Sequence, residues 1–350
     1  MISRRRLLLA GPAAAFADAG WALAPRQFVF PADHGAHPER RTEWWYVTGQ
    51  AQAGDRLFGF QVTFFRSRVA ATQQLRSRFA AKQLLFAHAA VTDVQGARLL
   101  HDQRIAREGF GVAEAATNDG RVHLRDWSLA RVDGAWQADV PAADFALELR
   151  CAETQPVLLQ GQQGLSRKGP LPEEASYYYS EPQLAVSGAL TLQGRRFEVT
   201  GRAWMDHEFS DEYLAPQAVG WDWVGMNLDD GSALMAFRIR RQDGSSLWDG
   251  GAFRTLRGEL TIANAGQTQF VPLRHWTSPL SNASYPVEWT LRTPAGAYTV
   301  RALVDNQELD SRGSTGAIYW EGLSDLIDSN GRRVGRGYLE MTGYATRLRM

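Results

Sequence analysis

The sequence has almost no cysteine and almost no lysine. Cys151 is the single cysteine among 350 residues, so no intrachain disulfide can form and the fold must be stabilised by its core. Lys82 and Lys168 are the two lysines, and the 38 basic residues are balanced by 38 acidic residues. A surface that follows a phosphate backbone needs an excess of positive charge. Nucleic acid is therefore not an expected partner.

Long apolar runs and several catalytic motifs are also missing. After the N-terminal region, no stretch approaches the ~18 apolar residues of a membrane-spanning helix, so no permanent membrane span is expected. The sequence has no GxSxG elbow, phosphate-binding loop, complete GxGxxG or HExxH pair, and Cys151 has no catalytic-cysteine context. These absences disfavour hydrolase, nucleotide-binding and zincin chemistry. We expect no cofactor and no metal.

The first 19 residues have the pattern of an export signal. Arg4 and Arg5 precede an apolar run, Leu7 to Phe16, and a small-x-small tripeptide at residues 17–19. This arrangement is typical of a twin-arginine signal peptide. We expect residues 1–19 to be removed and the mature protein to be periplasmic, with an uncleaved membrane anchor as the alternative.

From residue 26 onward the sequence has the texture of β-structure. Short runs such as FALELR and EWTLRT alternate apolar and polar residues, and Gly, Asp-Gly and Asn-Gly turns separate them. The best helix candidate is 71–85, where Leu75, Phe79 and Lys82 form a partial stripe. We predict an all-β protein, in which the segment 71–85 forms either a lid or a surface crossover.

The chain contains an internal similarity at a fixed offset. A gapless shift of 177 positions superimposes WWYVTGQAQAGDRLFGFQVTFFR on WDWVGMNLDDGSALMAFRIRRQD. Any two β-hairpins share some of this pattern, but a fixed-offset repeat favours tandem duplication. We predict two antiparallel β-barrel modules, residues 26–200 and 201–350, because barrels have no exposed strand edges and can enclose an apolar ligand. The shift pairs Trp44 with Trp221, Tyr46 with Trp223, Gly54 with Gly231, Leu57 with Leu234 and Phe60 with Phe237.

Five segments carry a family resemblance: FPADHGAHPERRTEWWYVTGQ, YYYSEPQLAVSGALTLQG, VTGRAWMDHEFSDEY, VGWDWVGMNLDDGSALMAFRIRRQDG and YLEMTGY. In this order they resemble successive motifs of the AttH and carotenoid 1,2-hydratase family, over almost all of the mature chain. The resemblance implies two lipocalin-like β domains. Family members include carotenoid hydratases, an isoflavonoid hydratase, pericyclases and proteins without an established enzymatic role. The resemblance therefore implies the fold more strongly than the reaction.

Hydration of an isolated carbon–carbon double bond sets clear chemical demands. It needs a strong proton donor, a group that stabilises the resulting cation, and a positioned water. A carboxyl group kept neutral by burial can donate the proton, an aromatic face can stabilise the cation, and histidine or a second carboxylate can accept the proton of water. The segment GRAWMDHEF offers these groups as Trp204, Asp206, His207 and Glu208.

Strand alternation leaves the orientation of these residues open. Counting from Phe197 and Val199 along one face puts His207 inward and Asp206 outward, but a bulge at Gly201 would reverse the phase. The structural alternative is that Asp206 and Glu208 pair with arginines and that His207 is a hydrogen-bonded core histidine.

The segment before the TEWWY motif admits similar alternatives. His34 and His37 lie between two prolines and are expected in a turn that leads into the first strand. They could meet His207, but no ligand spacing supports a metal site. Glu43 is expected to pair with an arginine. We predict that the ligand or the core beneath it contacts Trp44, Tyr46, Trp221, Trp223, Tyr178 and His34.

Two functions of different classes follow. The first is an exported lipocalin-like protein that binds an elongated apolar molecule, of terpenoid or lipid type, and hydrates a double bond, as a hydro-lyase similar to carotenoid 1,2-hydratases. The alternative is a non-catalytic periplasmic carrier or chaperone associated with an ABC-type export system. A weaker third interpretation is a module that docks on a membrane transporter.

Overall fold

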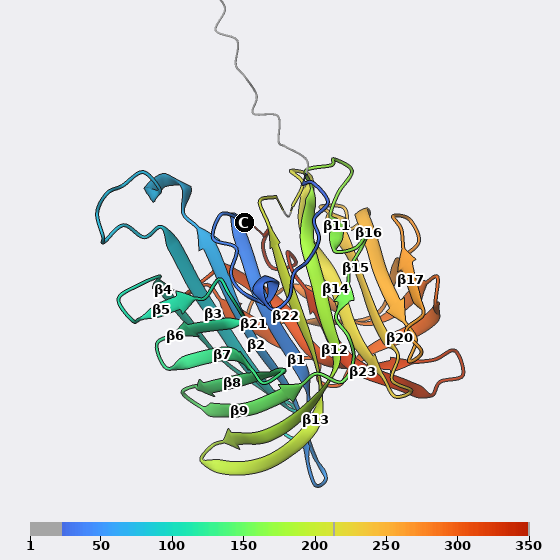
Figure 1. The fold of residues 1–350 in the computed structure, drawn as a ribbon. Helices are drawn as coiled ribbons and strands as arrows, with labels where there is room; N and C mark the ends of the chain where they lie inside the picture. The colour runs from blue at the N-terminus through green and yellow to red at the C-terminus, as the bar shows by residue number, and fades with distance from the viewer. Residues whose placement is uncertain (1–22, 213, 349–350) are drawn as a thin grey trace, which may run out of the picture.

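The described chain is built almost entirely from β-strands. The computed structural model describes residues 23–212 and 214–348, so the export signal predicted for residues 1–19 lies outside the described residues. Two antiparallel sheets and two short 3-10 turns, Ala32–His34 and Ala70–Thr72, make up the described fold (Figure 1). The prediction of an all-β protein with two tandem lipocalin-like barrels is confirmed.

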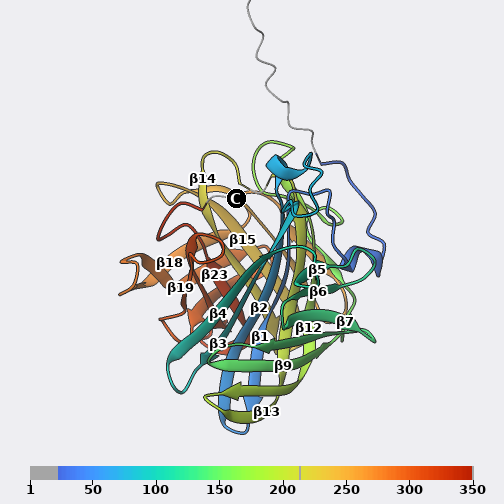
Figure 2. The ribbon, with the colours of Figure 1, turned by 90° about the vertical axis from the view of Figure 1, so that its left-hand side faces the viewer.

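The first sheet has its strands in the order β4-β3-β2-β1-β13-β12-β9-β8-β7-β6-β5, with β10 and β11 paired to β12. Contacts between β4 and β6 bring the two edges together, so this sheet is a nearly closed barrel (Figure 2). The strands are β1 (Thr42–Ala53), β2 (Arg56–Arg68), β3 (Gln83–Asp93), β4 (Arg98–Arg107), β5 (Ala113–Ala115), β6 (Arg121–Leu124), β7 (Trp127–Val132), β8 (Ala135–Pro141), β9 (Phe145–Ala152), β10 (Leu158–Leu159), β11 (Leu165–Arg167), β12 (Ala175–Leu192) and β13 (Arg195–Ser210).

The second sheet repeats this arrangement. Its order is β17-β16-β15-β14-β23-β22-β20-β19-β18, with β21 paired to β22, so each unit places its first hairpin beside its own last strand. The shared topology supports the duplication. The strands are β14 (Ala218–Leu228), β15 (Ala233–Arg241), β16 (Ser246–Arg254), β17 (Leu260–Ala263), β18 (Gln269–Thr277), β19 (Ser284–Thr293), β20 (Gly296–Ala302), β21 (Glu308–Ser311), β22 (Ala317–Ile327) and β23 (Arg333–Met341).

The gapless repeat holds in the first strand of each hairpin and fails after the turn. Tyr46 pairs with Thr63 on β2, whereas Trp223 pairs with Phe237 on β15. Because the second hairpin is three residues shorter between these pairs, Phe237 corresponds to Thr63, and the predicted pairing of Phe60 with Phe237 is wrong. The expected domain boundary between residues 200 and 201 falls inside β13, and the change of sheet comes between Ser210 and Ala218.

The helix candidate at 71–85 does not form a helix. The structure has a 3-10 turn at Ala70–Thr72, then a loop, and β3 begins at Gln83. Leu75 and Phe79 are 50% and 67% exposed. A short helix is stabilised mainly by packing of an apolar face. This segment has no such contact with the core.

The apolar core has two barrel centres and a third cluster between the barrels. On β1, Trp45 and Val47 point into the first barrel, while Tyr46 points to the other face and joins the third cluster. Strands that line the contact are therefore buried on both faces, as alternation of side chains requires. We call the third group the interbarrel cluster; its buried members include Tyr46, Tyr178, Trp204, Trp223, Met235, Phe237, Ile239, Leu323 and Tyr338.

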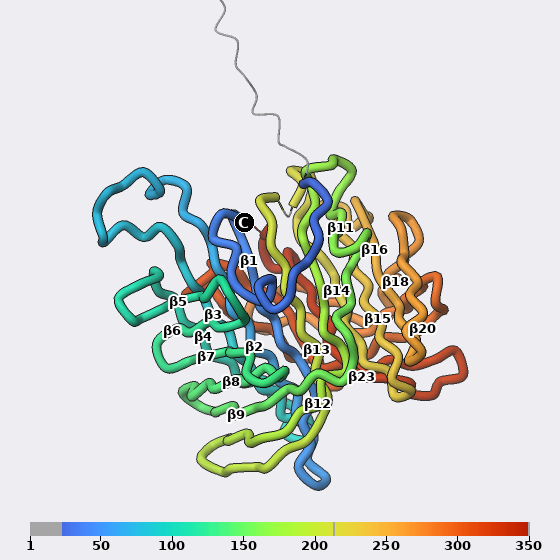
Figure 3. The backbone as a smooth tube through the Cα atoms, viewed as in Figure 1, coloured from blue at the N-terminus to red at the C-terminus, as the bar shows by residue number. Residues whose placement is uncertain are grey.

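The segment before β1 covers part of the first barrel. The rings of Phe28 and Phe30 contact Tyr179, and Figure 3 shows this segment in dark blue beside β1. Within the described residues, no helix is long and apolar enough to cross a membrane.

Candidate functional site

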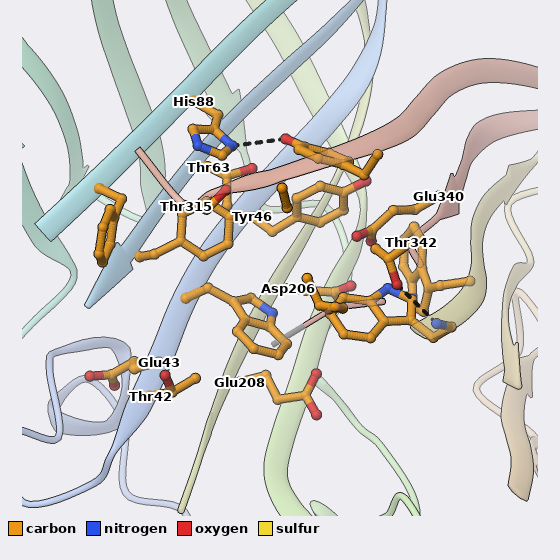
Figure 4. Close-up of a pocket in the computed structure, with 18 of the residues that line it drawn as sticks. Thr42, Glu43, Tyr46, Thr63, His88, Asp206, Glu208, Thr315, Glu340 and Thr342 are labelled. Atoms are coloured by element: carbon orange, nitrogen blue, oxygen red, sulfur yellow. Dashed lines mark hydrogen bonds between the residues drawn. The ribbon is translucent and has the colours of Figure 1, made fainter. Parts of the chain in front are cut away.

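A cavity of about 330 Å³ lies between the two barrels. Its walls are formed by β1, β2, β3, β12 and β13 from the first sheet and by β14, β15, β22 and β23 from the second (Figure 4). Five of the six residues predicted to contact a ligand line it, and His34 does not. The aromatic lining consists of Trp44, Tyr46, Phe65, Phe86, Tyr178, Trp221, Trp223, Phe237 and Tyr319.

The repeated aromatic positions of the two barrels meet in the wall of this cavity. The rings of Trp44 and Trp221 are stacked with centroids 6.4 Å apart, and Tyr46 meets Trp223 edge to face at 5.5 Å. These pairs are the equivalent positions of the repeat, so matching parts of the two barrels meet at the cavity. An apolar wall of this kind is typical of small-molecule pockets.

The structure decides the strand phase of the GRAWMDHEF segment. Gly201 pairs in register with Ala51 without a bulge, so the alternation that starts at Val199 continues to His207. Asp206 and Glu208 consequently lie on the opposite face from His207. That face is the outer surface of the first barrel, but the second barrel covers it, so the face is a cavity wall.

Asp206 is a buried carboxyl group surrounded by neutral hydrogen-bond donors. The Tyr178 hydroxyl donates to Oδ2 over 2.8 Å, and the Trp204 indole donates to Oδ1 over 2.7 Å. Ser180 also donates to Oδ1. Burial raises the pKa of Asp206 to about 7, and the charge of Glu208 adds to the rise, although the three hydrogen bonds oppose it. The ion pairs of the described chain do not include Asp206, and Lys168, which also lines the cavity, is paired with Glu208.

Tyr178 connects Asp206 to the second barrel. The Trp223 indole donates to the Tyr178 hydroxyl over 3.1 Å, and that hydroxyl donates to Asp206. Trp204 lies behind Asp206 in the interbarrel cluster. The carboxyl orientation is therefore held by groups from both barrels.

Glu208 differs from Asp206 because it has a cation. Lys168 Nζ lies 2.8 Å from Glu208 Oε1, and Ser176 donates to the same oxygen. The ammonium group also lies 4.4 Å from the centre of the Phe237 ring. The predicted ion pair of Glu208 therefore exists with a lysine in place of an arginine, and Glu208 is a poor candidate for a proton donor.

His207 and His34 lie on the other face, inside the first barrel. His207 is fully buried, and its Nε2 is 2.9 Å from Glu43 Oε1. His34 Nδ1 is 2.7 Å from the Tyr179 hydroxyl. Neither ring lines the cavity. The structural alternative, a hydrogen-bonded core histidine, describes both of them.

The first motif builds a buried network around Glu43, which was expected to pair with an arginine. Arg66 Nε lies 2.8 Å from Glu43 Oε2, and His37 Nδ1 lies 2.7 Å from Oε1. His37, Glu43 and His207 bring their ligand atoms within 4.8 Å of one another. A metal does not fit here, because Arg66, both imidazoles and the His37 backbone amide already occupy the carboxylate.

Two carboxyl groups of the second barrel were missed by the sequence analysis. Glu321 on β22 lies directly opposite Glu340 on β23, and both line the cavity. Burial raises the pKa of each; the charge of Glu340 adds to the rise for Glu321, and that of Asp206 to the rise for Glu340. The structure relates Glu340 to Asp206, because Tyr46 pairs with Asp206 as its equivalent Trp223 pairs with Glu340.

His88 was missed as well and marks another part of the cavity wall. Its Nδ1 is 2.9 Å from the Tyr319 hydroxyl and its Nε2 is 2.8 Å from Ser314 Oγ. Burial lowers the pKa of His88 to about 3. The ring is therefore neutral near pH 7 and cannot serve as a cationic acid.

Comparison with known proteins identifies related chains. A model of the AttH-like family matches residues 22–344. A crystal structure of a Nitrosomonas europaea protein assigned as AttH shares 45% identity at a TM-score of 0.86, covering 92% of this chain and 99% of that one. No curated protein shows significant sequence similarity to the chain.

Two more distant structures share the fold. Kievitone hydratase from Nectria haematococca is 13% identical at a TM-score of 0.71, covering 91% of this chain and 93% of that one. CghA, in complex with Sch210972, is 13% identical at a TM-score of 0.51, covering 89% of this chain and 90% of that one. At this identity the two similarities show the fold alone.

Proposed function

The chain belongs to the AttH-like family, and on that premise we propose that it binds an apolar molecule in the interbarrel cavity and adds water across one of its double bonds. The observation that carries the proposal is the setting of Asp206: a carboxyl group in a largely aromatic cavity, with no ion pair of its own among the described residues, whose pKa burial raises to about 7. Such a group holds its proton near neutral pH and can donate it. The hydratase among the fold neighbours supports water addition as the reaction class to test first.

The proposed reaction needs one carboxyl group and one water molecule. Asp206 gives its proton to one alkene carbon, and the other carbon becomes a cation that the indole faces of Trp44, Trp221 and Trp223 stabilise. The oxygen of water bonds to that carbon. The oxonium that forms then returns its extra proton to the Asp206 carboxylate, so the acid is regenerated.

The size of the cavity constrains the ligand. A volume of about 330 Å³ lies at the lower end of the roughly 300–1,000 Å³ of small-molecule pockets. A terpenoid of moderate length is therefore the ligand class to examine first. Mass spectrometry of small molecules extracted from natively purified protein would identify what the cavity holds.

The substitution Asp206→Asn tests the reaction. The amide keeps the shape of the carboxyl group but cannot act as the acid. With the monoterpene limonene as the probe, the variant should still bind the hydrocarbon and lose about 10²- to 10⁴-fold in hydration rate. Incorporation of heavy oxygen from labelled water into the product alcohol measures the rate. Asp222→Asn is the matched control, because Asp222 is a buried carboxylate paired with Arg238 away from the cavity. Asp222→Asn should lower stability and leave the rate of the folded fraction nearly unchanged.

A non-catalytic carrier serving an ABC-type exporter is the second candidate. It is favoured by the three hydrogen bonds that already hold Asp206 in the wall. A carrier would bind limonene with equal affinity in the native protein and in Asp206→Asn, and neither would incorporate heavy oxygen. That result would contradict the hydratase proposal.

We also propose that the protein is exported to the periplasm by the twin-arginine route. The support is the sequence of residues 1–19, with Arg4 and Arg5 before a short apolar run. Replacement of both arginines by lysine should leave the protein in the cytoplasm, as measured by cell fractionation. Unchanged periplasmic accumulation would point to another export route.

A further inference from the structure

A second polar site lies in the cavity wall contributed by the second barrel. Glu321 and Glu340 occupy directly opposed positions on neighbouring strands. Like charges at such positions repel each other. No lysine or arginine of the described chain compensates either carboxyl group. The pair therefore retains protons near neutral pH, and it is not used by the reaction proposed above.

Two buried polar atoms at this site have no partner. The Tyr46 hydroxyl and the Glu321 carboxyl group lie close enough to affect each other's pKa. Tyr46 Oη and Glu321 Oε1 nevertheless both lack a well-oriented hydrogen-bond partner among the described residues. Both side chains are buried, at 6% and 2% exposure, and both line the cavity. Leaving a buried polar atom unpaired costs about 1–3 kcal/mol, so two such atoms at one place indicate a missing polar partner.

The chemistry of the two atoms defines this partner. A phenol hydroxyl donates a hydrogen bond, and a carboxyl oxygen accepts one. A hydroxyl group can accept a hydrogen bond from the Tyr46 phenol and donate one to Glu321 Oε1. A single hydroxyl therefore satisfies both unpaired atoms. An ammonium group would need a charged carboxylate, but burial and the neighbouring charge keep the acid pair largely neutral.

We propose that Tyr46, Glu321 and Glu340 form a hydroxyl-binding subsite, which takes either a water molecule or the hydroxyl group of a ligand. The subsite rests on the proposed function in so far as the cavity is the ligand site. Asp206 and Glu340 occupy equivalent strand positions in the two barrels and lie within electrostatic reach of each other. During hydration the subsite holds the water before addition and the alcohol oxygen afterwards. Tyr46 and Glu321 are positioning residues in this scheme.

Limonene and α-terpineol provide the test, because the alcohol is the hydrocarbon plus one molecule of water. Quenching of tryptophan fluorescence measures the affinity of each probe. The native protein should bind α-terpineol about tenfold more tightly than limonene, as expected for one added hydrogen bond. Tyr46→Phe and Glu321→Met should each reduce this ratio to near one and change limonene affinity by less than about twofold.

Tyr319→Phe is the matched control. Tyr319 is an equally buried tyrosine in the same cavity, but its hydroxyl already has a partner in His88. The control should keep the preference for the alcohol. Thermal melting followed by circular dichroism confirms that each variant is folded before its affinities are compared.

The outcomes separate the subsite from the function on which it rests. Equal affinity of the native protein for the two probes, or a full alcohol preference in Tyr46→Phe, overturns the subsite and leaves the apolar-ligand proposal standing. Binding of neither probe overturns both. Crystal structures with each probe distinguish the two sources of the hydroxyl: water between Tyr46 Oη and Glu321 Oε1 in the limonene complex, and the ligand oxygen there in the α-terpineol complex.

Discussion

Three buried carboxyl groups show how the partners of a residue set its chemistry. Glu43 receives Arg66 and two imidazoles, which hold the pKa of its carboxyl group below the usual range against the effect of burial. Glu208 pairs with Lys168. Asp206 receives only neutral donors, and burial raises its pKa to about 7. Burial disfavours a charge in every case, so the presence of a cation decides whether the group stays ionised.

The raised pKa of Asp206 predicts a pH dependence of stability. Its pKa is about 7 in the folded protein and near 3.8 in the unfolded chain, so between these values the folded state binds more protons. The stabilising contribution is present below the unfolded pKa and is lost as pH rises toward 7. Each unit of pKa difference corresponds to about 1.4 kcal/mol. When pH rises from about 4 to about 7, the free energy of unfolding should therefore fall less for Asp206→Asn than for the native protein.

Urea unfolding at a series of pH values provides the measurement. Glu181, Glu321 and Glu340, whose pKa values burial also raises, contribute with the same sign in both proteins, so the difference between the two curves reports Asp206 together with its effect on Glu340. Glu43 acts with the opposite sign, because its lowered pKa stabilises the fold above the unfolded value and this contribution is lost as pH falls. Parallel curves for the two proteins would contradict the assignment of a raised pKa to Asp206.

At the scale of the element, β13 places functional side chains on both of its faces. It pairs with β1 on one side and β12 on the other, and it sends His207 into the first barrel and Asp206 into the cavity. Close approach of β1 and β13 depends on Gly201. A Cβ at that position would lie 1.9 Å from the Gln50 carbonyl oxygen. The strands would have to separate to accommodate it.

Gly201→Ala should therefore destabilise the protein more than an alanine at an unhindered glycine. Gly54 is the control, because a Cβ there meets no atom within 4 Å and its φ of +56° costs an alanine about 1–2 kcal/mol. We expect a loss of more than about 2 kcal/mol for Gly201→Ala, measured by urea unfolding. A smaller loss of unfolding free energy than for Gly54→Ala would show that β13 can shift away from β1 at low cost. The close pairing of these strands would then not be what positions the site.

At the scale of the whole molecule, the two barrels share one apolar cluster and one cavity. Leu323 on β22 is fully buried in the interbarrel cluster and packs beside Gly59 on β2. Contacts of this kind hold the two walls at a fixed distance. The cavity is therefore a product of barrel packing and belongs to neither barrel alone.

Leu323→Ala should lower the unfolding free energy by about 2–5 kcal/mol and weaken binding of limonene, because the deletion opens a void between the cavity walls. Leu326→Ala is the control: Leu326 lies on the same strand, equally buried, but in the core of the second barrel. The control should cost a similar amount of stability and leave limonene affinity unchanged. Chemical unfolding and fluorescence quenching measure the two quantities, and equal affinity losses in both variants would refute a cavity set by barrel packing.

Much of the fold follows from local rules that a sequence displays. Side chains alternate along a strand, so the sequence places Asp206 and His207 on opposite faces. The repeated hairpin pattern indicates two equivalent units. Both inferences succeed because they depend only on residues that are neighbours in the chain. The same rules failed where the turn lengths differ, at Phe60 and Phe237, and where an isolated stripe had no surface to pack against, at 71–85.

The character of the site was decided by tertiary structure. Alternation defines two faces but not which of them a second barrel will cover, so only the packed structure turned the outer face of β13 into a buried cavity wall. Glu321 and Glu340 lie on different strands, and their approach depends on the register of β22 and β23. The sequence by itself determined the fold class, the repeated unit and the split between Asp206 and His207. The burial that protonates Asp206, and the pairing of Glu321 with Glu340, arise only when the strands and barrels pack together, because desolvation depends on everything that surrounds a group in space.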